Sequence, residues 1–150
     1  MAGTRRLRVF LCHASQDKPA VRELYKRLAA EKWIDPWLDE EEILPGQDWN
    51  HEIEKAIRSA DAILICLSSK SVSKEGYVQK EIKRALDIAA EKPDGTIFII
   101  PIRLDECEVP ERLRPYQYVD YFGDAEHKDR VYSNLIKALK VRAENLGIKL

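Results

Sequence analysis

Short apolar runs alternate along the chain with segments in which apolar residues recur every three or four positions. The runs predict five strands, at residues 7–12, 34–38, 61–67, 96–102 and 116–120. The helical repeats predict four helices, at residues 17–30, from 48 through 57, at 77–90 and at 124–146. The third and fourth strands contain almost no polar residues, so we expect both of their faces to be buried. Pro36 lacks a backbone N–H and favours an edge position for the second strand.

Polar segments separate these elements. Residues 39–47 follow the second strand and contain Pro45 and Gly46, a pair that is typical of a turn. Asp48 then has the right position and chemistry to cap the next helix. Residues 68–76 form a polar loop after the third strand.

Strands that alternate with helices predict a parallel sheet with helices on both faces. Five strands in a chain of this length predict an α/β fold, a single flavodoxin-like domain with strand order 2-1-3-4-5. In such sheets ligands bind beyond the carboxyl ends of the strands, where the strand order reverses. We therefore expect the chemistry to lie in the loops at residues 12–15, 39–47 and 67–76.

Composition narrows the class of protein. The 150 residues fit one domain, with a core from about residue 7 to residue 146. A net charge of −1 lacks the basic excess of nucleic-acid modules, and no apolar run approaches the about 20 residues of a membrane span. We expect neither nucleic acid nor membrane as a partner. Cys12 and Cys66 are most simply buried thiols, and the three widely spaced cysteines of the chain fit a reducing, cytoplasmic compartment. The three histidines lack metal-ligand spacing, so we expect no metal site.

Two residues on the helix at 77–90 are candidates for a site. Tyr77 and Glu81 are four residues apart, so they share one helix face. Glu81 falls at the edge of the apolar stripe, roughly 90° from its centre. One interpretation is a half-buried carboxylate at the rim of a cleft. The other is a surface glutamate that pairs with Lys80 or Arg84, as charged helix residues usually do.

Residues in the predicted loops also allow more than one interpretation. Asp39 ends a strand on the ligand side, although charged loop residues are usually solvated. His13 follows the first strand and is either a catalyst or a hydrogen-bonded loop residue. Trp49 opens a helix and either packs as a staple or walls a nucleotide pocket. Ser68 is most simply a turn or capping residue. The glycine-rich phosphate loops GxGxxG and GxxxxGK[ST] do not occur in the sequence.

In order and spacing, these segments together resemble a TIR (Toll/interleukin-1 receptor/resistance) domain, from residue 8 to about 146. Residues 9–17 (VFLCHASQD) resemble the first box of the family. Residues 37–46, from Trp-Leu-Asp-Glu to Leu-Pro-Gly, resemble the second box and its BB loop. Trp49 and the apolar pattern after it match the next helix, and residues 59–61 lead into the third strand as in the family.

Some TIR domains are scaffolds, and others cleave NAD⁺ with a glutamate in a WxxxE pattern on the helix after the third strand. Residues 77–81 (YVQKE) match this pattern with Tyr in place of Trp. The resemblance therefore implies that Glu81 is catalytic, with Tyr77 as an aromatic wall. It implies further substrate-binding positions at His13, Ala14, Asp39, Gly46, Trp49 and Ser68. NAD⁺ would be the substrate, with no cofactor, and the products would be nicotinamide and ADP-ribose or a cyclic isomer.

The resemblance also implies assembly and a role in bacterial defence or effector signalling. The loop at 39–47 would contact another copy or another TIR domain. We expect the acidic residues 40–42 to complement Lys137, Lys140 and Arg142 on the exposed face of the last helix. Two alternatives stay open. One is a non-enzymatic scaffold for TIR–TIR signalling. The other is a nucleoside deoxyribosyltransferase-like enzyme, which has a related fold and also uses a glutamate at a glycosidic bond.

Overall fold

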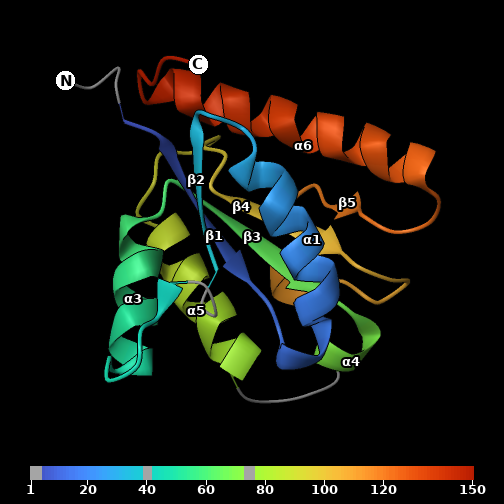
Figure 1. Ribbon diagram of the computed structural model, residues 1–150, viewed down its shortest axis with the longest axis horizontal. Coiled ribbons are helices and arrows are strands. Elements are labelled where there is room, and N and C mark those ends of the chain that lie inside the picture. Colours follow the sequence, from blue (N-terminus) through green and yellow to red (C-terminus); the bar gives the residue numbers. More distant parts are fainter. Residues whose placement is uncertain (1–4, 39–41, 73–76) are drawn as a thin grey trace.

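Five parallel strands form one sheet in the order β2-β1-β3-β4-β5 (Figure 1). The computed structural model describes residues 5–38, 42–72 and 77–150. In chain order, the strands are β1 (Leu7–Cys12), β2 (Ile34–Trp37), β3 (Ala62–Leu67), β4 (Ile99–Arg103) and β5 (Val119–Asp120). The strand order confirms the flavodoxin-like sheet predicted from the sequence, and β2 with Pro36 lies at its edge.

Helices cover both faces of the sheet. They are α1 (Lys18–Ala29), α3 (Trp49–Ser59), α4 (Ser69–Val72), α5 (Tyr77–Ala89) and α6 (Ala125–Asn145), with short 3₁₀ turns at Ser15–Asp17 and Glu111–Leu113. The helices α1 and α6 lie on one face, and α3 and α5 lie on the other (Figure 1). Asp48 caps α3 as predicted, because its Oδ1 accepts a hydrogen bond from the His51 N–H at 3.0 Å.

Successive side chains of β1 enter two different hydrophobic clusters. Val9 and Leu11 pack with α1 and α6, whereas Phe10 and Cys12 pack with α3 and α5. This follows from the alternation of side chains along a strand and from the helical cover on both faces. The parity of a β1 residue therefore decides which pair of helices it meets. Cys12, the last residue of the strand, faces α3 and α5.

Three elements differ from the sequence prediction. The segment after β3 was predicted as loop, but it contains the short helix α4, whose first turn is closed by reciprocal hydrogen bonds between Ser68 and Ser71. β4 begins at Ile99 rather than at residue 96, because the Thr96 N–H is still bonded to the carbonyl of Pro93 in the preceding turn. β5 is only Val119–Asp120, because residues 113–116 complete a turn before the chain enters this strand.

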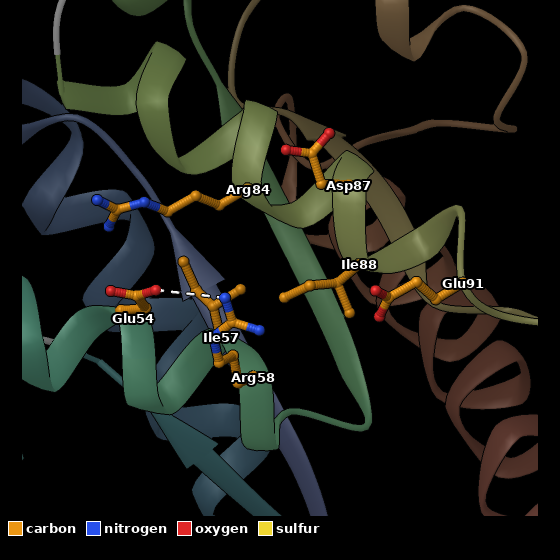
Figure 2. A pocket seen from close by; sticks show the side chains of 7 residues that line it. All are labelled: Glu54, Ile57, Arg58, Arg84, Asp87, Ile88 and Glu91. Atoms are coloured by element: carbon orange, nitrogen blue, oxygen red, sulfur yellow. Dashed lines mark hydrogen bonds and ion pairs between the residues drawn. The ribbon is translucent and has the colours of Figure 1, made fainter.

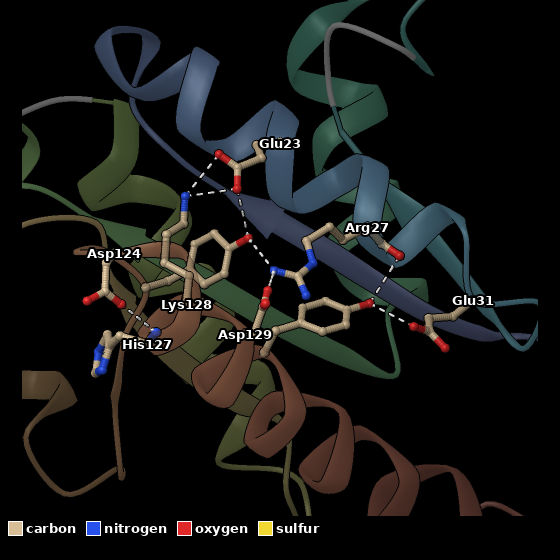
Figure 3. Close-up of polar contacts among 9 residues, drawn as sticks. Glu23, Arg27, Glu31, Asp124, His127, Lys128 and Asp129 are labelled. Carbon is tan, nitrogen blue, oxygen red and sulfur yellow. Dashed lines mark hydrogen bonds and ion pairs between the residues drawn. The ribbon is translucent and has the colours of Figure 1, made fainter.

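A polar network joins α1 to α6 and to the segment before α6 (Figure 3). The Tyr121 hydroxyl donates to Glu23 at 3.0 Å and accepts from Arg27 at 3.2 Å. Lys128 pairs with the same Glu23 carboxylate at 2.8 Å. The guanidinium of Arg27 also lies 4.0 Å from the ring centroid of Tyr132. These contacts link two helices that are far apart in sequence on one face of the sheet.

The end of α6 corrects one expectation about charge. Arg142 is buried, and its Nε donates to the carbonyl oxygen of Asp61 at 2.8 Å. Burial lowers the pKa of this guanidinium. The Asp61 carboxylate accepts two hydrogen bonds from Arg5, at 2.6 and 3.0 Å. Arg142 therefore belongs to a structural cluster at the amino end of β3. Only Lys137 and Lys140 of the three predicted basic residues are exposed.

An ion pair closes the β5 edge of the sheet. Arg103 donates from Nε and Nη2 to the two carboxylate oxygens of Asp120, at 2.6 and 2.8 Å. Its Nη1 donates to the carbonyl of Cys107 at 2.8 Å, which ties down the long connection after β4. The hydrogen bonds from Arg103 hold the pKa of Asp120 below its ordinary value.

We predict that Asp120→Asn lowers the free energy of unfolding at pH 7 by about 1 kcal/mol, because it breaks a partly buried two-point ion pair. The pKa of Asp120 is lower in the folded than in the unfolded protein. The stabilisation that this carboxylate contributes to the folded state is therefore present above its unfolded pKa of about 4, and it is lost as the pH falls through its folded pKa. The difference between wild type and variant should therefore shrink in acid. Urea unfolding at pH 7 and below pH 4 measures it. The matched control, Asp129→Asn, removes an exposed partner of Arg27 and should change little.

Candidate active site

The carboxyl ends of β1 and β3 bring two predicted site segments together. The two strands are hydrogen-bonded neighbours, with Cys12 opposite Ile65. His13 and Ala14 leave the end of β1, and Ser68 leaves the end of β3. All three residues are buried. The topology therefore places these segments side by side at the edge of the sheet where ligands bind in this fold.

Glu81 points into this edge from α5. Its side chain is only 4% exposed, and its Oε2 accepts a hydrogen bond from the Cys12 thiol with a sulfur–oxygen distance of 3.5 Å. The interpretation of Glu81 as a surface residue is therefore wrong. The carboxylate is also buried more deeply than the half-buried position at the rim of a cleft that the other interpretation describes. Position along α5 explains this, because Glu81 precedes the fully buried Ile82 and lies one turn before Ala85. A buried carboxylate at the ligand edge is the central feature of the site.

Cys12 is the residue that the sequence analysis did not assign to the site. It was interpreted as a plain buried thiol, and it is one, but it also contacts Glu81. A signal for this was present in the sequence. Cys12 shares strand parity with Phe10, which predicts that both face the same pair of helices. Which helices cover that face depends on the tertiary fold.

A hydrogen-bonded cluster continues along the edge from β1 to β3. Ser68 Oγ donates to Asp17 Oδ2 at 2.9 Å, so Asp17 is held by the residue that follows β3 and does not cap α1 with its own side chain. Partial burial raises the pKa of the Asp17 carboxyl, and the charge of Asp105 adds to the rise, while the bond from Ser68 opposes it. His13 Nδ1 donates to the carbonyl oxygen of Ala14 at 2.9 Å.

Ser68 acts as the capping residue that the sequence indicated, and Ser69 adds further hydrogen bonds. Ser68 Oγ accepts from the Ser71 N–H at 3.1 Å. Ser69 donates from its backbone N–H and its hydroxyl to the carboxylate of Asp105, at 2.9 and 3.0 Å. These bonds satisfy N–H groups at the start of α4 and join the loop after β3 to the loop after β4.

The other predicted site residues lie nearer the β2 side or outside the described residues. Gly46 has φ = 91° and completes the Leu44–Gln47 turn, which explains its glycine. Trp49 is the exposed first residue of α3, so its role in a pocket stays a prediction. Asp39 lies outside the described residues, as do Glu40 and Glu41. Tyr77 begins α5, one turn before Glu81, and its side chain lies outside the described part.

A separate cavity of about 120 Å³ opens between α3 and α5 (Figure 2). Ion-forming side chains surround it, and Glu54 and Arg58 pair across one turn of α3 at 3.4 Å. Glu91, which follows α5, also lines it. In the part of the chain that the structure describes, no group of three His, Cys, Asp or Glu side chains is placed to hold a metal ion. No helix of that part is long and apolar enough to span a bilayer.

A family model described as "TIR domain" matches residues 9–136 of the chain. The chain belongs to the TIR domain family. The match spans the sheet from β1 through β5 and most of α6, and it includes Cys12, the Ser68 segment and Glu81. This confirms the resemblance drawn from the two boxes and from the order of the elements.

A relative of known function is similar to part of the chain. The TIR domain is 32% identical over 95 residues to the NAD(+) hydrolase TcpA of Theionarchaea archaeon (strain DG-70-1). That match covers 63% of this chain and 27% of the relative, so the matched part is about a quarter of the relative's length.

Solved structures share the fold. The TIR domain of the Toll-related receptor TRR-2 from Hydra magnipapillata superposes with a TM-score of 0.71 at 22% identity, over 88% of this chain and 97% of that one. The TIR domains of the activated Roq1 resistosome give a TM-score of 0.59 at 20% identity, over 94% of this chain and 81% of that one.

We predict that Asp17→Asn raises the free energy of unfolding at pH 7 by roughly 0.5 kcal/mol, a small value because the carboxylate is partly solvated. The pKa of Asp17 is higher in the folded than in the unfolded protein. The stabilisation that this carboxyl contributes to the folded state is therefore complete below its unfolded pKa of about 4, and it is lost as the pH rises through its folded pKa. In Asp17→Asn the side chain does not ionise, so the variant does not lose stability in this way. Its amide oxygen can still accept the hydrogen bond from Ser68. Urea unfolding at pH 7 and pH 3.5 measures the difference. Asp87→Asn, the same change at an exposed residue of α5, is the control and should change the stability at pH 7 little.

Proposed function

We propose that this TIR domain is an NAD⁺ glycohydrolase or ADP-ribosyl cyclase in which Glu81 is the catalytic carboxylate. The observation that carries the proposal is the burial of Glu81 at the carboxyl edge of the sheet, in hydrogen-bond contact with the end of β1. Burying an ionised carboxylate is costly, and such groups concentrate at functional sites. The 32% identity to an NAD(+) hydrolase over 95 residues supports the same class of reaction.

The chemistry requires one carboxylate. The bond between C1′ of the ribose and the nicotinamide nitrogen breaks, and its electron pair leaves with nicotinamide, which becomes neutral. The ribose carbon develops positive charge, as in an oxocarbenium-like transition state, and Glu81 stabilises that charge. Water then adds to C1′ and releases a proton, which gives ADP-ribose. If a nitrogen of the adenine or a ribose hydroxyl attacks instead, the product is a cyclic isomer. No general acid is needed, because the leaving group is cationic at the start.

The substrate would lie along the carboxyl edge of the sheet, where His13 and Ala14 follow β1 and Ser68 follows β3. Tyr77 would stack on a ring of the dinucleotide one helical turn from Glu81. Asp39, Gly46 and Trp49 would border the site from the β2 side. These contacts are proposed from the family pattern, together with the position of each residue around the sheet edge.

We also propose that self-association through the loop at 39–47 activates the domain. Leu44 at the described end of this loop is 62% exposed, so its apolar side chain is accessible to a second copy. A largely apolar groove of about 470 Å³ lies elsewhere, between β4, the segment before β5 and α6, and it includes Ile97, Ile100 and Leu135. Leu44 of one copy would fill the groove of the next. The resistosome neighbour indicates that TIR domains occur in activated assemblies.

The proposed function predicts that Glu81→Gln lowers the rate of NAD⁺ cleavage at least about a hundredfold, because the amide cannot stabilise the developing cation. Consumption of NAD⁺ at high protein concentration, with the products separated by chromatography, measures the rate and identifies the product. Glu91→Gln is the matched control, since Glu91 follows the same helix and lines the cavity between α3 and α5 (Figure 2). It should retain wild-type activity.

Each outcome of this experiment assigns the function. If only Glu81→Gln loses NAD⁺ cleavage, the result supports both the enzymatic activity and Glu81 as the catalytic carboxylate. Equal cleavage by wild type and Glu81→Gln would contradict Glu81 as the catalytic residue. No cleavage by folded, assembled wild-type protein would favour a scaffold for TIR–TIR signalling. If the protein releases the free base from deoxynucleosides and does not cleave NAD⁺, the deoxyribosyltransferase-like alternative is favoured.

The proposed self-association predicts that Leu44→Glu weakens the association by about tenfold or more, because a charged side chain cannot enter the apolar groove. Sedimentation velocity over a concentration series measures the association. Leu150→Glu makes the same change at a residue of similar exposure, 57%, that does not line the groove. If both variants associate like wild type, the proposed loop contact is excluded. If only Leu44→Glu is weakened, its NAD⁺ cleavage should fall in parallel.

A further inference from the structure

We propose that Cys12 is a positioning residue for Glu81: its thiol donates a hydrogen bond that orients the buried carboxylate and favours its ionised form. This inference deepens the proposed function and rests on it, since it concerns the efficiency of the carboxylate that acts on NAD⁺. It assigns a role at the site to a cysteine that is not among the substrate-binding positions predicted from the sequence.

The geometry of the contact supports a hydrogen bond. The Cys12 sulfur lies 3.5 Å from Glu81 Oε2, an ordinary distance for a thiol donor because sulfur is larger than oxygen. Cys12 is 1% exposed and Glu81 is 4% exposed. Water therefore competes little for this carboxylate oxygen, and a weak donor has a larger effect there than in solvent.

The donor is held on a rigid part of the fold. Cys12 is the last residue of β1, which pairs with β2 on one side and β3 on the other. Glu81 comes from α5, a helix that packs on that face of the sheet. The contact thus fixes a side chain of the helix to the central strand. A catalytic group needs this kind of support from its neighbours to keep its orientation.

A thiol suits this position better than a hydroxyl would for packing. Cys12 lies in an apolar cluster with Phe10, Ile65 and Ile82. A thiol can donate one hydrogen bond and otherwise pack as a small apolar group. A serine hydroxyl is a stronger donor, but its oxygen carries lone pairs that would also be buried. Serine at position 12 is therefore expected to keep the function at some cost in stability.

The other two cysteines provide an internal comparison. Cys66 packs in the cluster on the α1 and α6 face, away from α5. Cys107 is buried in the same cluster as Cys12, and it interacts with Asp105 rather than with Glu81. Cys107→Ala therefore removes a buried thiol of the same chemistry from the same cluster without removing a contact to Glu81. It is the matched control.

The experiment compares Cys12→Ala, Cys12→Ser and Cys107→Ala with wild type. We expect Cys12→Ala to lower kcat for NAD⁺ cleavage by about tenfold, with KM changed less than about twofold, since a hydrogen bond to a charged group is lost. The acidic midpoint of the kcat profile should move to higher pH by roughly half a unit or more, because the ionised form loses a donor. Cys12→Ser should restore both quantities. Cys107→Ala should change stability but not the profile.

A direct readout separates this proposal from the proposed function. With ¹³C-labelled glutamate, NMR follows the Glu81 carboxyl through its titration whether or not the protein cleaves NAD⁺. An identical Glu81 titration in wild type and Cys12→Ala would overturn the role of Cys12, even if the enzyme is active. Cleavage of NAD⁺ that survives Glu81→Gln would instead overturn the proposed function. An unchanged kcat profile in folded Cys12→Ala, with thermal unfolding shifted as in Cys107→Ala, would reduce Cys12 to a packing residue.

Discussion

The covering of both faces of the sheet is the constraint on which the site depends. Because β1 is buried on both sides, each of its side chains must belong to one of two hydrophobic clusters. Alternation then sends Leu11 toward α1 and α6 and Cys12 toward α3 and α5. A shift of one residue in β1 would exchange the two sets. The contact between Cys12 and Glu81 exists only in the observed register.

Buried polar residues gather at the two ends of the sheet, and they serve different purposes. At the amino end, Asp61 and Arg142 are satisfied by well-defined partners that join β3 to the segment before β1 and to α6. At the carboxyl end, Ser68 caps the turn that follows β3, and Glu81 accepts a hydrogen bond from the Cys12 thiol. The polar residues of the amino end thus join elements of the fold, whereas those of the carboxyl end lie at the edge where ligands bind in this class of sheet.

The errors of the sequence analysis have local physical causes. Ser68 and Ser71 close a helical turn in a segment too short to show helical periodicity. The turn at Pro93 delays β4, and the turn at residues 113–116 shortens β5, although both segments have strand-like composition. Arg142 was placed on the exposed face of α6 because charge usually indicates exposure. The carbonyl oxygen of Asp61, 81 positions away in sequence, provides the partner that makes its burial possible.

Sequence by itself determined the class of fold, the strand order, the caps at Asp48 and Ser68, and Glu81 as the candidate carboxylate. These features depend on periodicity, turn chemistry and short motifs, which are local properties of the chain. Only the tertiary structure decided that Glu81 is buried and that Cys12 is its neighbour. Helical periodicity placed Glu81 at the margin of an apolar stripe, where the pattern favours exposure of a charged residue without excluding its burial. Glu81 is buried because α5 packs against β1. This packing brings the thiol of Cys12, 69 positions away in the sequence, to the carboxylate.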